Sequence, residues 1–167
     1  MESQRGYTHE FLGQLFRDMV LIRRFEERAS ELRIARLIPG SLHVCIGQEA
    51  VAVGVCATLG PRDFITSTHR GHGHILARGG DPARMYAELL ARRDGYNKAK
   101  GGSQHIASIE LGIIGANGIV GGGIPIAMGA GLALQLAGQA AARDAASPRA
   151  RYAGGVAVAF FGDSAAN

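Results

Sequence analysis

The chain has 167 residues, enough for one domain with a hydrophobic core. Apolar residues make up 47 % of it and charged residues 19 %, a balance that excludes an intrinsically disordered protein. The net charge is +4, but the basic residues are interspersed with acidic ones and form no stripe with aromatic side chains, so we expect no nucleic-acid partner. Cys45 and Cys56 lie in apolar surroundings, and residues 1–10 lack the apolar core of a signal peptide. These features predict reduced, buried thiols and a cytoplasmic location.

The first predicted element is a long amphipathic helix from Thr8 to about Arg36. Apolar side chains recur along it at helical spacing, and charged residues fill the opposite face. Thr8 is suited to cap its N-terminus, and Pro39-Gly40 ends the region. We therefore expect residues 1–40 to form an N-terminal helical segment and residues 41–167 to form the first part of the following domain.

The next predicted elements are a helix, a strand and another helix. The helix runs from Gln48 or Glu49 to Leu59, because Gly60-Pro61 is a strong stop signal. The β-prone run from Phe64 to Thr68 predicts a short strand. Asp81 and Pro82 open the third helix as N-cap and first residue, and Gly95 closes it.

The densest polar cluster follows the predicted strand, with His69, Arg70, His72 and His74 among glycines. The three histidines could converge on zinc, but a zinc site needs further ligands and no second group of ligands lies nearby. An oxyanion site fits better, because Arg70 offers a planar fork of donors and the glycines let the backbone approach a ligand. His43, in a polar segment upstream, either forms a loop hydrogen bond or faces a substrate.

An uncharged stretch from Leu111 to Ala142 is long enough to span a bilayer. Glycines and Pro125 interrupt it, so we expect a loop over residues 115–123 and then a buried helix over about residues 124–142, without a membrane partner.

Upstream, the Lys-Gly-Gly-Ser run at residues 100–103 is either a solvated connector or a phosphate contact. It lacks the residue order of a P-loop.

The last segment combines a strand with a tight turn. Val156 to Phe161 is a continuous apolar run, which predicts a strand buried on both faces of a parallel sheet. The chain then turns at Gly162 and offers the carboxylate of Asp163. Such turns at strand ends bind phosphates, and a carboxylate there can hold magnesium. An ordinary turn in which Asp163 caps a following helix is the alternative. The order of elements predicts an α/β fold with a parallel sheet.

Five segments, in this order and spacing, carry a resemblance to a known family: His43–Ala50, Ser67–His74, Lys100–His105, Gly115–Gly123 and Gly162–Asn167. Together they resemble the alpha subunit of thiamine-diphosphate-dependent 2-oxo acid dehydrogenases, the decarboxylating first component. Within this family the chain is most similar to the acetoin dehydrogenase branch, followed by pyruvate dehydrogenase. The resemblance implies the parallel-sheet thiamine-diphosphate-binding fold with helices on both faces, of which residues 41–167 form the first part.

The resemblance also implies roles for individual residues. His69 and Arg70 bind the cofactor diphosphate, and Asp163 binds magnesium. Catalytic roles fall to His43, on the substrate or diphosphate side, and to His74. The residues expected to contact thiamine diphosphate are His69, Arg70, Gly118, Val120, Gly162, Asp163, Ser164 and Ala165.

The partners implied by the resemblance are a beta subunit, in an α2β2 tetramer, a lipoyl acyltransferase component and a small-molecule substrate, acetoin or pyruvate.

Ser164 stands where the family has glycine, and a left-handed backbone there would cost about 1–2 kcal/mol. The family's magnesium motif continues beyond Asn167. We therefore expect weak or no cofactor binding by this chain alone. A catalytically inactive scaffold or assembly fragment is the alternative function, and a zinc-dependent hydrolase is a weaker one.

Overall fold

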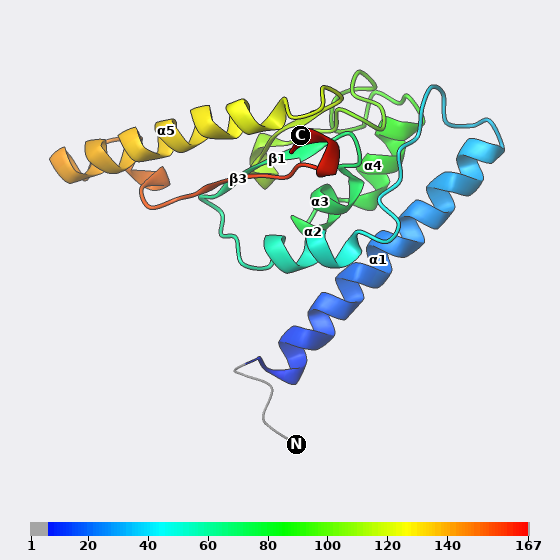
Figure 1. Cartoon of the computed structure of the whole chain (residues 1–167), viewed down its shortest axis with the longest axis horizontal. Coiled ribbons are helices and arrows are strands. Elements are labelled where there is room, and N and C mark those ends of the chain that lie inside the picture. Colours follow the sequence, from blue (N-terminus) through cyan, green and yellow to red (C-terminus); the bar gives the residue numbers. More distant parts are fainter. Residues whose placement is uncertain (1–6, 167) are drawn as a thin grey trace.

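The computed structural model describes residues 7–166 (Figure 1). Its centre is a three-stranded parallel sheet in the order β2-β1-β3. The strands are β1 (Phe64–Thr68), β2 (Ile113–Asn117) and β3 (Ala157–Ala159). The middle strand pairs with both neighbours, so that Ile65 lies opposite Ile113 on one side and opposite Val158 on the other. The predicted α/β fold with a parallel sheet is confirmed.

Four helices follow the predicted order with adjusted ends, and one further short helix was not predicted. They are α1 (His9–Ile34), α2 (Glu49–Cys56), α3 (His72–Ala77), α4 (Pro82–Leu89) and α5 (Gly123–Arg143). The predicted caps are present, because the side chains of the residues preceding α1 and α4 accept backbone N–H groups of the first turn. Two helices end before the predicted Leu59 and Gly95. Short 3-10 turns complete the structure at η1 (Ile109–Leu111), η2 (Ala150–Tyr152) and η3 (Asp163–Ala165).

The sheet is covered on both faces. In Figure 1, α5 lies along one face, and α1, α2 and α3 form a layer on the other. The main core lies on the α1–α3 side and includes Ile22 and Phe25 from α1, Ile65 and Ile113 from the sheet and Ile75 from α3, each at most 3 % exposed. The long first helix therefore shares its core with the sheet domain.

The sequence interpretation missed two elements. The β2 strand overlaps the segment over residues 115–123 that was expected to be a loop, and α3 begins inside the polar cluster at His72. The predicted strand over residues 156–161 is wrong in extent and burial: only three residues pair, all half-buried, and Phe161 is 53 % exposed. The reason is that β3 forms an edge of the sheet within residues 7–166, with β1 on its one paired side.

The prediction of a buried helix over residues 124–142 is also wrong in burial. By length and composition α5 could cross a membrane. In the described structure only 17 % of its most apolar stretch is buried. Ala127, Leu134 and Ala137 face the sheet domain. The outer face of α5 carries exposed apolar side chains: Ile124, Ile126, Met128, Leu132 and Leu136. We call these five residues the α5 outer face.

Candidate functional site

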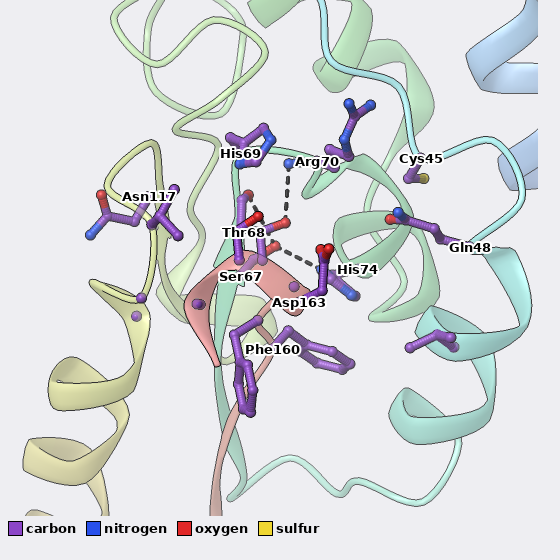
Figure 2. A pocket seen from close by; sticks show the side chains of 18 of the residues that line it. Cys45, Gln48, Ser67, Thr68, His69, Arg70, His74, Asn117, Phe160 and Asp163 are labelled. Atoms are coloured by element: carbon purple, nitrogen blue, oxygen red, sulfur yellow. Dashed lines mark hydrogen bonds between the residues drawn. The ribbon is translucent and has the colours of Figure 1, made fainter. Parts of the chain in front are cut away.

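A cleft opens at the edge of the sheet where the strands end (Figure 2). It has a volume of about 490 Å³ and is lined by segments that directly follow β1, β2 and β3. Since all three strands are parallel, their carboxyl ends meet at this edge, which is where open α/β sheets bind ligands. The far wall comes from α2 and the segment before it, through Gln48, Val51 and Ala52.

Arg70, at the end of β1, is held by the backbone of a neighbouring segment. Its Nη1 donates to the carbonyl oxygen of Val44 at 2.6 Å, and its own backbone N–H donates to Thr68 Oγ1 at 3.2 Å. Both Arg70 and His69 line the cleft and are half-buried, and their contact with a diphosphate stays a prediction. Because one guanidinium nitrogen is fixed, the remaining N–H groups have a defined direction in which to meet an anion.

His43 does not line the cleft but lies beside it. Its ring makes an edge contact with His69, with centroids 5.1 Å apart. The side-chain nitrogen of Gln104 lies 3.0 Å from His43 Nδ1, so Nδ1 accepts the amide N–H. Burial, followed by the nearby His69 and Arg70, lowers the pKa of His43 below its usual value. The catalytic role of His43 stays a prediction.

His74 forms part of the cleft floor beneath the strand ends. Its ring stacks on Phe160, with centroids 3.9 Å apart, and its Nδ1 lies 2.7 Å from Ser67 Oγ (Figure 2). Burial lowers the pKa of His74 to about 4. The ring is therefore neutral near pH 7 and can exchange a hydrogen bond with a ligand without adding charge. Its catalytic role also stays a prediction.

The three histidines that suggested zinc point to different places. His69 faces the cleft, His74 contacts Ser67, and His72 lies in the core beside Glu26. Within residues 7–166, no group of three or more His, Cys, Asp and Glu side chains is placed to hold a metal ion. The geometry therefore provides no ligand set for the zinc interpretation among these residues.

The turn after β3 completes the cleft with Gly162, Asp163, Ser164 and Ala165. Asp163 is exposed and supplies the one carboxylate among the lining residues, and it takes part in none of the ion pairs within the described residues. Ser164 lies in the 3-10 turn η3 and has no positive φ, so the possible left-handed strain at this position does not arise. Its hydroxyl remains compatible with a phosphate contact. Asn167 lies outside the described residues.

The glycine-rich segment after β2 forms the opposite wall. Asn117 and Val120 line the cleft, whereas Gly118 lies behind it, close to the side chains of Gln104 and His105. The Asn117 side chain accepts the backbone N–H of Ile119 at 2.8 Å, which tightens the turn. Val120 is 60 % exposed and lines the cleft, whereas Gly118 does not, and the contact of either residue with the aminopyrimidine ring stays a prediction.

The loop around residues 97–102 is ordered by a buried carboxylate. Glu88, 1 % exposed, accepts four backbone N–H groups from this loop at 2.7–3.1 Å. Lys98 and Lys100 are exposed and do not line the cleft. The loop instead places Ser103, whose Oγ accepts the backbone N–H of His43.

Sequence reasoning did not single out several cleft residues. Ser67 and Thr68 are the last residues of β1, and their hydroxyl groups at a strand end were the available signal. Gln48 immediately precedes a helix that shows no side-chain cap, so its amide is available to the cleft. Cys45 also lines the cleft, but burial raises the pKa of its thiol far above the usual value, so it is unreactive as a nucleophile.

The lining residues fit a diphosphate and a magnesium ion. Arg70, His69 and the Thr68 hydroxyl supply donors, and Asp163 supplies the oxygen ligand that magnesium prefers. The cleft also has apolar surface, from Phe160, Val120 and Val51, for an uncharged ring. The chemistry of this donor set therefore matches a phosphorylated cofactor with an aromatic part.

Comparisons with known proteins agree with this geometry. The family model described as dehydrogenase E1 component matches residues 17–167. The chain is 44 % identical to the alpha subunit of acetoin:2,6-dichlorophenolindophenol oxidoreductase of Bacillus subtilis, over 96 % of this chain and 44 % of that protein. It is 45 % identical to the pyruvate dehydrogenase E1 component subunit alpha of Zymomonas mobilis, over 95 % of this chain and 41 % of that protein. For the mitochondrial pyruvate dehydrogenase E1 alpha subunit of Pisum sativum, the identity is 44 % over 93 % and 36 % of the two chains.

The chain spans less than half the length of these three relatives. The family match nevertheless includes all three strands, the polar cluster after β1 and the turn after β3, which are the segments that form the cleft. Sequence similarity and site geometry thus coincide on the same residues, and the chain belongs to the dehydrogenase E1 component family.

Proposed function

We propose that this chain provides the diphosphate- and magnesium-binding side of the active site in a thiamine-diphosphate-dependent oxidoreductase. One observation carries the proposal: Arg70 follows β1 and Asp163 follows the adjacent strand β3, and both residues line the same cleft. A cation and a carboxylate at that edge suit a diphosphate bound together with a metal ion. Membership of the dehydrogenase E1 component family supports the same cofactor.

Each residue contributes a separate task to this site. Arg70, one of whose guanidinium nitrogens is held by the Val44 carbonyl, would bind the diphosphate through its remaining N–H groups, and Asp163 would hold magnesium. His69 and the Ser164 hydroxyl would add donors, and Val120 would supply apolar surface for a ring of the cofactor. When bound, thiamine diphosphate supplies the electron sink for breaking a carbon–carbon bond beside a carbonyl group.

The proposed reaction is oxidative decarboxylation of pyruvate or oxidative cleavage of acetoin, followed by transfer of the acetyl unit to a lipoyl group of an acyltransferase. Both substrates are named in the relatives, one for acetoin and one for pyruvate. We further propose a beta subunit as partner, in an α2β2 tetramer, and a cytoplasmic location. The α5 outer face supports a protein partner, because five large apolar side chains of one helix are exposed there and such residues mark interaction sites when a partner covers them.

Magnesium-dependent diphosphate binding tests the proposal. Isothermal titration of the chain with inorganic pyrophosphate, and then with thiamine diphosphate, should give weak binding that requires magnesium. Arg70→Ala and Asp163→Asn should each abolish it, while Arg143→Ala, at the far end of α5, should leave it unchanged. Binding that is insensitive to both cleft variants would refute the assignment, and tight binding would refute the expectation that the chain alone binds weakly. Acetyl transfer on addition of a beta subunit would exclude the inactive-scaffold alternative.

A further inference from the structure

A buried carboxylate outside the cleft contacts the one histidine of the polar cluster that turns into the core. Glu26, on α1, is fully buried, and both of its oxygens lie 2.9 Å from His72 Nδ1. Its Oε1 also accepts the backbone N–H of Cys45 at 3.0 Å. Because a carboxylate only accepts hydrogen bonds, Nδ1 of His72 carries a proton. The ring orientation of His72 is therefore set by a residue of a helix that does not line the cleft.

The other side of the His72 ring continues toward the cleft. Its Nε2 lies 3.0 Å from Ser103 Oγ and 3.1 Å from the Ser103 carbonyl oxygen. Ser103 Oγ accepts the backbone N–H of His43 at 3.0 Å. An unbroken chain of polar contacts thus runs from Glu26 through His72 and Ser103 to His43, and it joins α1, α3, the loop after α4 and the segment before α2.

A second path from Glu26 reaches Arg70. The Cys45 N–H bound by Glu26 follows Val44, whose carbonyl oxygen accepts the Arg70 guanidinium at 2.6 Å. The backbone on both sides of Val44 is consequently anchored, on one side by Ser103 through the N–H of His43 and on the other by Glu26.

We propose that Glu26 is a positioning residue for the diphosphate-binding side of the cleft. It acts through His72 and Ser103 on His43, and through Cys45 on the carbonyl group that orients Arg70. This inference rests on the function proposed above. A fully buried carboxylate and imidazole are costly to desolvate, and an apolar pair of similar volume often stabilises a core as well or better. Their fully satisfied contacts instead specify one arrangement of the backbone beneath His43 and Arg70.

Glu26→Gln separates positioning from packing because it keeps the side-chain shape but replaces one acceptor oxygen by an N–H donor. Nuclear magnetic resonance of the isotope-labelled chain should show shifted ring nitrogens for His72 and shifted backbone amides for His43 and Cys45. The matched control is Glu27→Gln, on the exposed side of the same helix, which should move none of these signals. If the His43 and Cys45 amides stay in place in a folded Glu26→Gln chain, the proposal is wrong.

Ser103→Ala tests the same series of contacts from its other end. It should shift the NMR signal of the Glu26 side-chain carboxyl carbon through His72, because Ser103 makes no hydrogen bond to Glu26 among those of the described residues. This variant also decides the question if Glu26→Gln fails to fold, because an unmoved Glu26 carboxyl signal would show that His72 does not connect the two residues.

Pyrophosphate affinity in the presence of magnesium gives the functional readout. Glu26→Gln and Ser103→Ala should each weaken it about tenfold, as outer partners of binding residues do. The double variant should be less than additive, because both changes interrupt one path; full additivity would contradict the proposal. Magnesium-dependent pyrophosphate binding that Arg70→Ala leaves unchanged would refute the proposed function, whereas the amide shifts decide the positioning role independently.

Discussion

We predict that the carboxylate of Glu88 contributes several kcal/mol to the free energy of unfolding, because it binds four backbone N–H groups of one loop. Its Oε2 accepts the N–H groups of Asn97 and Ala99, and its Oε1 accepts those of Gly101 and Gly102. Glu88→Gln retains one oxygen and turns the other position into a donor that faces two further donors. Each N–H group left unpaired costs about 1–3 kcal/mol, so the two together cost about 2–6 kcal/mol.

The loop itself limits how much of this penalty is realised. Lys98 and Ala99 are held at φ values of 56° and 68°, in the left-handed region that costs a residue other than glycine about 1–2 kcal/mol. If the loop releases Glu88 and rehydrates, it recovers part of that strain. We therefore expect Glu88→Gln to lower the free energy of unfolding by about 2–4 kcal/mol, a large share of the 5–15 kcal/mol typical of a domain.

Urea unfolding followed by circular dichroism measures this loss. The matched control is Glu27→Gln, which removes an exposed ion pair with Arg24 (3.0 Å) and should cost about 0–1 kcal/mol. A loss below about 1 kcal/mol for Glu88→Gln, similar to the control, would show that the four N–H groups are equally well satisfied by water and would refute the reasoning.

Three further predictions concern titration and reactivity. Burial alone would raise the pKa of Asp63, but two backbone N–H groups and nearby arginines outweigh it and hold the pKa below its usual value. Asp63→Asn should therefore be less stable than the parent at pH 7, with a gap that closes as pH falls through the lowered pKa; a gap that widens in acid contradicts this. The His74 ring should stay neutral in NMR titrations down to about pH 5, and a midpoint near 6.5 would exclude its burial. Because burial raises the pKa of Cys56 to about 11 and that of Cys45 further, neither thiol should react with a disulfide reagent before unfolding; reaction of the folded chain would disprove this.

The strand-end site could be predicted from sequence because its signals are local. A β-prone run followed by His69 and Arg70, and an apolar run followed by Gly162 and Asp163, each mark the end of a strand. Parallel pairing then brings the two ends together, as the structure confirms. The β2 strand gave little signal, since only Ile113 and Ile114 are apolar before Gly-Ala-Asn, and its pairing with β1 is decided by the tertiary structure.

The buried carboxylates of Glu26 and Glu88 were harder to recognise from sequence, because glutamate side chains are usually exposed to solvent. A weak signal existed in the spacing: Glu26 lies four residues after Ile22 and three before Ala29, on the apolar face of α1. Glu88 likewise follows Met85 by three residues on α4. What spacing could not show is which groups each carboxylate accepts, because those donors lie 9–46 residues away along the chain.

The proposed beta subunit would account for both the exposed α5 outer face and the open cleft. The helix begins at Gly123, which lines the cleft, and Ile124, Ile126 and Met128 continue directly from there across its exposed side. A partner that covered these side chains would approach the same edge of the sheet where Arg70 and Asp163 lie. Burial of the apolar face would then exclude water from the cleft in the same step, and a lower local dielectric would strengthen the contacts of both charged groups with a diphosphate and its metal. The proposed beta subunit would thus complete the site by covering it, because this chain supplies the charged wall and leaves its apolar edge open.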